Sequence, residues 1–376
     1  RCWLFAATNV LRERIAQARN LENFELSQSY LAFWDKFERC NYFLESILET
    51  AALPTTDRTV MHILSTGVHD GGQWDMFANI VRKYGVVPKD VYDETYQSSN
   101  TRSMNAQLNR TIKVAAAGLR RMAADKAGAD AIQAEKNKTL DAIYGFLCSC
   151  YGEPPKAFDF EFVDKDQVYH IEKNLTPLTF AERYVGDLLD QVVSVINAPT
   201  ADKPYHKTYT IRLLGNVVEG RPVVHLNLTM DELKAAIIAQ LKAGKVVWFG
   251  SDVGHFGERT LGVWDDRSFD FAALTGLSLA MDKADALDYG LAAMNHAMVL
   301  TGVNLDEAGK PTRWKIENSW GDKNGEKGYY VCSDSWFDQY VFQAAVEREY
   351  LGGLADLAAQ EPIVLEPWDP MGTLAD

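Results

Sequence analysis

The strongest constraint on the fold of this chain is a change of sequence pattern near residue 155. Before that point, apolar residues recur at helical spacing over the first 50 residues and again between residues 101 and 147. After it, short β-branched and aromatic runs alternate with turn residues, which is typical of antiparallel strands. This order of predicted elements, with helices first and strands later, predicts an α+β fold of two lobes with a seam between them. Such seams are preferred places for active sites.

Seven runs in the second half of the chain predict strands: FDFEF, YTIRLL, VVHLNL, KVVWFG, AMVLTGV, RWKIEN and GYYVC. One helix is expected among them, because Thr229 and Glu232 have the spacing of a capping box and Gly244 closes the apolar pattern. In the first half, the Ala-, Lys- and Arg-rich stretch 101–147 predicts a helical hairpin inserted into the main fold.

Composition narrows the possible partners. The formal net charge of -14 repels a phosphate backbone, so we expect no nucleic-acid partner. No run approaches the ~18 apolar residues of a membrane span, so we expect no membrane partner either. The five cysteines are few, odd in number and irregularly spaced, which indicates reduced thiols and a cytoplasmic location.

Cys2 stands at the start of the first predicted helix, which is a favourable position for a nucleophile. The helix macrodipole and the unpaired N–H groups of the first turn stabilise a thiolate, and a nearby imidazolium lowers the pKa of the thiol further. On position alone, however, a cysteine beside Trp3 is more often an inert core residue. Both interpretations stay open at this point.

His296 and Asn318 are the candidates for a base and its orienting amide. His296 precedes the apolar run Met298–Leu300, where a ring is held rigidly at the end of a sheet, although a lone histidine there is more often structural. Asn318 has the chemistry to accept the second ring N–H, and Trp320 to shield that hydrogen bond from water. The alternative for the motif NSWG is a simple turn.

The segments RCWLFA, NHAMVLTGV and ENSWGDKNGEKGYY, in this order, resemble the papain-like cysteine peptidases. Four further segments look like the bleomycin hydrolase and bacterial aminopeptidase C family: SQSYLAFWDKFERCNYFLE, DGGQWDMFANIVRKYGVVPKDVY, VVWFGSDVG and the tail EPWDPMGTLAD. This resemblance covers nearly the whole chain. The wide separation of Cys2 and His296 implies large insertions between them.

The resemblance implies a papain-like α+β fold of two lobes, one helical and one a barrel-like antiparallel sheet. We expect a helical lobe with the Cys2 helix over residues 1–96 and a helical insertion over residues 97–155. A mainly β lobe would follow over residues 156–350, and a C-terminal arm over residues 351–376 would reach the active site.

The resemblance also implies a mechanism without cofactor or metal. Cys2 would attack the scissile carbonyl, His296 would transfer the proton, and Asn318 would orient His296. Family members complete the oxyanion hole with a glutamine shortly before the nucleophile, in a segment that this sequence does not include. We therefore expect the chain to be an incomplete version of a longer natural protein.

Substrate binding follows from the same resemblance. Gly71 and Gly72 resemble the glycines that pair with an extended peptide in papain-like clefts, although an ordinary helix-entry turn explains them too. The arm would block the cleft and present its end, Ala375 and Asp376, to the free α-amine of a peptide. Asp376 is expected to be removed or tolerated. The implied activity is that of an aminopeptidase acting on peptides with a free N-terminus.

Family members form homohexamers, and the aromatic run 30–43 is compatible with packing between subunits or within the core. Two alternatives to the aminopeptidase stay open: a papain-like endopeptidase, and a catalytically silent oligomeric binding chamber. Cys148 and Cys150 have no matching ligand pair for a metal. His255, near Asp252, ranks below His296 because no orienting amide follows it.

Overall fold

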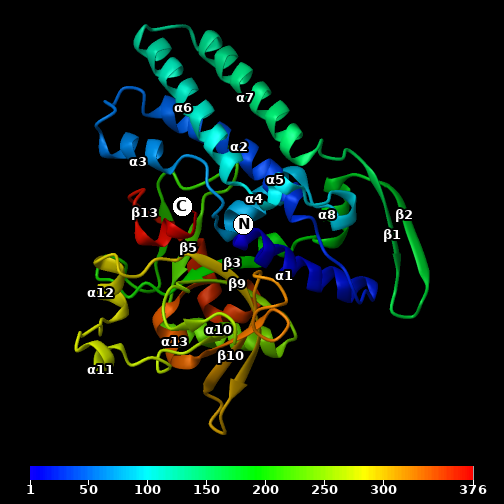
Figure 1. The fold of residues 1–376 in the computed structure, drawn as a ribbon, viewed down its shortest axis with the longest axis vertical. Helices are drawn as coiled ribbons and strands as arrows, with labels where there is room; N and C mark the ends of the chain where they lie inside the picture. The colour runs from blue at the N-terminus through cyan, green and yellow to red at the C-terminus, as the bar shows by residue number, and fades with distance from the viewer. Residues whose placement is uncertain (376) are drawn as a thin grey trace.

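The computed structural model describes residues 1–375 and places most helices in one half of the molecule and the large sheet in the other (Figure 1). The helices of the first half are α1 (Cys2–Arg19), α2 (Gln28–Glu49), α3 (Arg58–Thr66), α4 (Trp74–Tyr84), η1 (Lys89–Val91), α5 (Tyr96–Ser99), α6 (Arg102–Ala124) and α7 (Ala129–Tyr151). The later ones are α8 (Pro177–Tyr184), α9 (Leu188–Gln191), α10 (Met230–Lys242), α11 (Phe271–Thr275), α12 (Lys283–Asp288), α13 (Asp334–Tyr340), η2 (Arg348–Ala359) and η3 (Pro370–Ala375).

The large sheet has eleven strands in the order β13-β4-β5-β3-β12-β6-β9-β10-β11-β8-β7. Their bounds are β3 (Val192–Ile196), β4 (Thr208–Ile211), β5 (Val224–Asn227), β6 (Val247–Ser251), β7 (Gly257–Glu258), β8 (Val263–Trp264), β9 (His296–Leu305), β10 (Pro311–Glu317), β11 (Tyr329–Ser333), β12 (Val341–Glu347) and β13 (Ile363–Leu365). Most neighbours are antiparallel, but β3 with β5, β4 with β13, and β8 with β11 are parallel. The strands β1 (Phe158–Val163) and β2 (Tyr169–Leu175) form a separate hairpin that projects from the body (Figure 1).

The helix that begins at Cys2, α1, is the element that joins the two halves. α1 packs against α2 and α4 on one side and against β6 and β9 of the sheet on the other. Its buried residues Trp3, Leu4, Ala7, Leu11 and Ile15 recur at helical spacing, so that one stripe of α1 enters the core. The start of α1 therefore lies at the junction between the helices and the sheet (Figure 1).

The predicted α+β arrangement is confirmed. All seven predicted runs contain strands, and α10 begins with the predicted capping box of Thr229 and Glu232. The stretch 101–147 forms the hairpin of α6 and α7. The aromatic run on α2 is largely buried within the chain, with Phe33 completely enclosed, which favours core packing for that helix.

Several elements were not predicted: β2, β3, β12, β13 and α13. β12 (VFQAAVE) has few β-branched residues, and it is a strand because β3 and β6 bind it on both edges. Asp376, a predicted binding residue, lies outside the described residues. Within residues 1–375, no helix has both the length and the apolar character needed to cross a bilayer.

Candidate active site

Cys2 is the first residue of α1, and its thiol opens into a cavity of about 400 Å³. Because α1 starts here, the thiol lies at the positive end of the helix dipole, which favours the thiolate. His296 lines the same cavity from the other half of the molecule. The structure thus brings together two residues that are far apart in the sequence.

His296 is the first residue of β9 and pairs with Ser251 of the neighbouring strand β6. Its ring is buried and hydrogen-bonded to the Cys2 thiol. The other ring nitrogen, Nε2, donates to Asn318 Oδ1 over 2.8 Å. Each nitrogen of the imidazole therefore has a defined partner, which fixes its tautomer and orientation.

Asn318 follows directly after β10, and two hydrogen bonds with backbone groups hold it in place. Its N–H donates to the carbonyl oxygen of Gly328 over 3.1 Å, and its side-chain Oδ1 accepts a second bond from the Ser319 N–H at 2.8 Å. Trp320 stacks on the imidazole of His296, with the ring centroids 4.8 Å apart and the planes at 28°. The amide is fixed in place, and the indole covers one face of the histidine.

The pKa of the Cys2 thiol lies close to neutral pH. Burial alone would raise the pKa of this thiol, but the hydrogen bond and the positive charge of His296 outweigh that effect and lower the pKa from 9.0 to about 7. A substantial fraction of the thiol is thus ionised near neutral pH. The other buried thiols differ, because burial raises the pKa of Cys40 to about 12.

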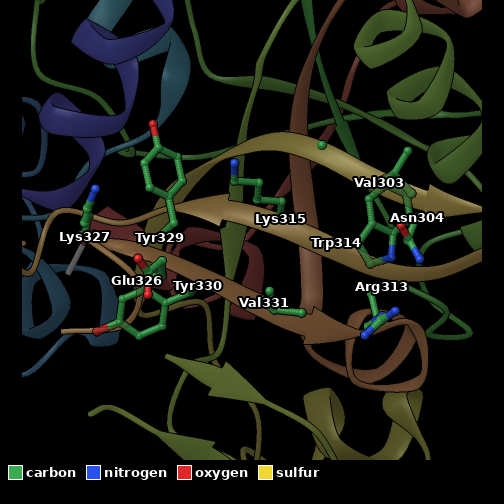
Figure 2. A pocket seen from close by; sticks show the side chains of 11 residues that line it. Val303, Asn304, Arg313, Trp314, Lys315, Glu326, Lys327, Tyr329, Tyr330 and Val331 are labelled. Carbon is green, nitrogen blue, oxygen red and sulfur yellow. The ribbon is translucent and has the colours of Figure 1, made fainter. Parts of the chain in front are cut away.

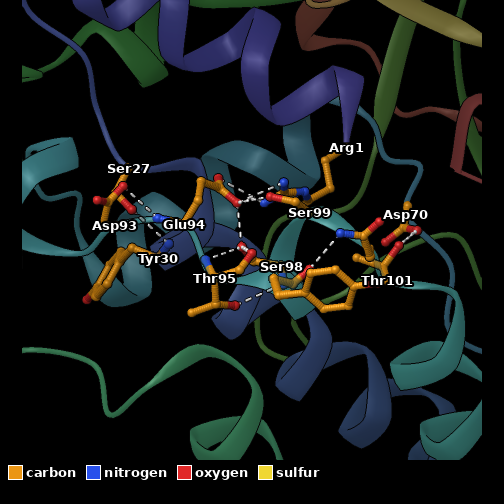
Figure 3. A network of polar contacts seen from close by, with 12 residues as sticks. Arg1, Ser27, Tyr30, Asp70, Asp93, Glu94, Thr95, Ser98, Ser99 and Thr101 are labelled. Carbon is orange, nitrogen blue, oxygen red and sulfur yellow. Dashed lines mark hydrogen bonds and ion pairs between the residues drawn. The ribbon is translucent and has the colours of Figure 1, made fainter.

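Several polar residues of the helical half also line this cavity. Asp70, Ser98, Ser99 and Thr101 line it beside Cys2. Thr101 donates to Asp70 over 2.6 Å, and the two arms of the Arg1 guanidinium donate to Glu94 over 3.2 and 3.0 Å (Figure 3). These bonds tie the segment before α6 to the rim of the cavity.

The segment of Gly71 and Gly72 lies beside α1. The indole of Trp3 donates to the carbonyl oxygen of Asp70 over 2.8 Å, which joins this segment to α1. A Cβ atom on Gly72 would lie 2.5 Å from the Trp3 ring, so only glycine fits. The Gly72 N–H donates to the carbonyl oxygen of Leu374 over 2.9 Å.

Residues 370–375 therefore lie along Gly71 and Gly72, which we call the glycine wall. We call residues 370–375, the helical turn η3, the arm tip. Gln73 Nε2 donates to the carbonyl oxygen of Met371 over 3.2 Å, and Arg39 Nη1 donates to that of Ala375 over 3.4 Å. Met371, Leu374 and Ala375 are all buried. Ala375 is thus beside the predicted substrate-binding glycines.

Sequence reasoning missed the charged residues behind the glycine wall. Lys36 and Arg39 of α2 are buried, and their side chains donate to the carbonyl oxygens of His69 and Gly71, respectively. Lys36 also pairs with Asp70 at 2.7 Å. A signal for these residues exists, because two cations stand one turn apart on a helix that is otherwise rich in aromatics.

The weaker candidates lie elsewhere. His255 pairs with Asp252 at 3.3 Å and is not among the residues that line the cavity with Cys2. No group of three or more metal-ligating side chains occurs in the described part of the chain.

Another hollow, of about 640 Å³, lies over β9, β10 and β11 and is lined by residues such as Arg313 and Lys315 (Figure 2). It shares no residue with the Cys2 cavity.

Comparison with known proteins identifies related chains. The model of the peptidase C1-like family matches residues 1–372. Aminopeptidase C of Streptococcus thermophilus is 51% identical over 377 residues, which cover 100% of this chain and 84% of that protein. Human bleomycin hydrolase is 40% identical over 384 residues, again covering 100% of this chain and 84% of the relative.

A solved structure agrees with these matches. The crystal structure of PepW from Lactobacillus rhamnosus HN001 superimposes with a TM-score of 0.96 at 51% sequence identity. The alignment covers 99% of this chain and 84% of that one. The similarity therefore extends over the helices, the large sheet and the arm alike.

Proposed function

This chain belongs to the peptidase C1-like family and is a cysteine-type aminopeptidase, and we propose that it removes N-terminal residues from peptides through a thioester on Cys2. The proposal assigns the catalytic roles to Cys2, His296 and Asn318. It assigns the restriction to free N-termini to the C-terminal arm. Neither assignment requires a cofactor or a metal.

In the first half of the reaction, the Cys2 thiolate attacks the carbonyl carbon of the scissile amide. The C–N bond breaks, the protonated His296 gives its proton to the leaving amine, and an acyl thioester remains on Sγ. In the second half, neutral His296 takes a proton from water, and the resulting hydroxide attacks the thioester. The C–S bond breaks, the free amino acid leaves, and the Cys2–His296 pair is restored.

Asn318 and Trp320 act on His296. The 2.8 Å bond to Asn318 Oδ1 keeps one ring nitrogen turned away from the substrate and the other turned toward Cys2. The stacked indole of Trp320 excludes water from this bond and keeps it strong. These contacts support a ring that donates and accepts a proton without changing its position.

The observation that carries the aminopeptidase proposal is the hydrogen bond from the Gly72 N–H to Leu374 O. An extended peptide with residues upstream of the scissile bond would pair with this glycine wall. The arm tip already occupies it, so we propose that only one substrate residue fits between the arm tip and Cys2. The end of the chain, including Asp376, would then face the α-ammonium group of the substrate.

Two wider properties complete the proposal. We assign the enzyme to the cytoplasm, which the five free cysteines support. We also propose a homohexamer, as the family resemblance implies. Large apolar side chains are exposed between residues 261 and 291, among them Leu274 at 81% and Leu261 at 73% exposure, and they are suited to contacts between copies.

The proposal is tested by hydrolysis of two fluorogenic aminoacyl amides that differ only in N-acetylation. We expect the free-amine compound to be cleaved much faster than the N-acetylated one, and neither to be cleaved by Cys2→Ala. Equal cleavage of both compounds would indicate an endopeptidase-type cleft. Cleavage of neither compound by a folded protein would indicate a silent binding chamber.

A further inference from the structure

We infer that Arg39 is a positioning residue that fastens the arm tip to the glycine wall and thereby sets the preference for free N-termini. This inference rests on the proposed function, because it gives one residue control over the proposed role of the arm. Arg39 stands on α2 and does not line the cavity that contains Cys2. It acts on the reaction only through other groups.

Three acceptors surround the guanidinium of Arg39. Nη1 donates to the carbonyl oxygen of Ala375 over 3.4 Å, Nη2 donates to that of Gly71, and Nε donates to Asp35 Oδ2 over 2.8 Å. A planar guanidinium presents donors in several fixed directions, so one side chain binds the wall and the arm together. The ammonium group of a lysine lacks this planar set of donors and is not suited to bind the wall and the arm together.

The guanidinium is held independently of the arm. Asp35 is buried at 2% exposure and accepts a further bond from Asn216 Nδ2 over 2.9 Å, which fixes its carboxylate. The Trp3 ring lies 5.7 Å from the guanidinium carbon of Arg39. Contacts outside the arm therefore hold the guanidinium where it binds the arm tip.

Arg39 and Gly72 bind consecutive carbonyl groups of the arm. The Gly72 N–H binds Leu374 O, and Arg39 binds Ala375 O. A peptide with upstream residues can bind only when the arm tip is displaced, so its apparent affinity scales with the displaced fraction. Weakening the Arg39 contact raises that fraction, while the free-amine substrate, which fits beside the docked arm, gains nothing.

The test uses the full chain with Arg39→Lys and, as matched control, Arg82→Lys, whose side chain donates to Leu189 O and Asp190, both outside the arm. The measured quantity is the ratio of kcat/KM for N-acetylated over free-amine substrates. Arg39→Lys should raise this ratio about tenfold. Arg82→Lys should leave it unchanged. Leu374→Asp, which puts a charge at a buried arm position, should raise the ratio by itself.

The double variant Arg39→Lys/Leu374→Asp separates the two roles. If Arg39 acts through the arm, adding Arg39→Lys to Leu374→Asp changes the ratio no further. If Leu374→Asp raises the ratio but Arg39→Lys does not, the inference about Arg39 is wrong and the role of the arm stands. If Leu374→Asp releases the arm tip to limited proteolysis without raising the ratio, the proposed role of the arm itself is wrong.

Asp35→Asn/Arg39→Met provides a second variant in case Arg39→Lys is poorly folded. It removes both members of the buried pair, so no unpaired charge remains. The ratio should rise as in Arg39→Lys, and the arm tip should become sensitive to limited proteolysis. An equal loss of activity on both substrates, with a protected arm tip, would show that Arg39 only supports the cleft wall.

Discussion

Gly72 faces the indole of Trp3 so closely that a Cβ atom would lie 2.5 Å from the ring. Trp3 follows Cys2 in α1, and its indole N–H donates to the carbonyl oxygen of Asp70 over 2.8 Å. The position of Cys2 is therefore linked to the absence of a side chain on Gly72.

Gly72→Ala should displace Trp3 and with it the start of α1. We expect a loss of about 1 to 3 kcal/mol in the free energy of unfolding, typical of overpacking, together with a fall in kcat. Gly118→Ala is the matched control, because Gly118 lies in α6 with no atom within 4 Å of an added Cβ. That variant should be stabilised by about 0.5 to 1 kcal/mol. Urea unfolding checks both, and a Gly72→Ala protein as stable as Gly118→Ala would refute the linkage.

The reactivity of Cys2 toward iodoacetamide should rise with pH through a midpoint near 7, because His296 lowers the pKa of the thiol to about 7 despite burial. In His296→Ala both effects of His296 are lost while burial still raises the pKa of the thiol, so the midpoint should move well above 7. Peptide mapping by mass spectrometry distinguishes Cys2 from the other four cysteines. The same midpoint in both proteins would contradict the assigned pair.

Arg12 of α1 binds both carboxylate oxygens of Glu317 at 3.0 Å, one residue before Asn318. This contact joins the helix that begins at Cys2 to the strand that ends just before Asn318. Glu317→Gln should lower kcat/KM about 3- to 10-fold, because the relative position of the two groups is loosened. Arg12 also contacts Glu13, which is 42% exposed, and Glu13→Gln should retain full activity. Equal effects of the two substitutions would show that the contact with Glu317 has no positioning role.

His225 makes the stability of the sheet depend on pH. Its ring is fully buried, and burial lowers its pKa to about 4. The unfolded chain, with a histidine pKa of about 6.5, binds more protons below that value, so stability falls as pH drops from 6.5 toward 4.

Urea unfolding at pH 7 and pH 5 should show that His225 accounts for about 2 kcal/mol of this loss. His225→Gln, which does not titrate, should lose correspondingly less stability between the two pH values. Parallel losses in both proteins would assign the pH dependence to other groups.

Local patterns were sufficient to predict many of the elements. The capping box at Thr229, the hairpin of α6 and α7, and the strand that follows His296 depend on nearby residues, and all three are in the structure. β12 was missed because its Ala- and Gln-containing sequence becomes a strand only between β3 and β6. Its conformation is a consequence of tertiary pairing.

The residues of the candidate site also fall into two groups, those that the sequence predicted and those that it did not. Cys2, His296 and Asn318 were selected by residue type and by resemblance to a family, and the structure brings them into one hydrogen-bonded chain. Arg39 and Lys36 could not be assigned, because their acceptors are backbone carbonyl oxygens of segments far away in the sequence. Periodicity shows which face of a helix is buried, but it does not show which carbonyl group lies opposite.

Active-site labelling tests the central claim most directly. The protein is incubated with an aminoacyl chloromethyl ketone carrying a free α-amine and, separately, with its N-acetylated form. The account predicts one label per chain, on Cys2, from the free-amine reagent only, and no label in His296→Ala. Labelling of another cysteine, or equal labelling by both reagents, would contradict the account.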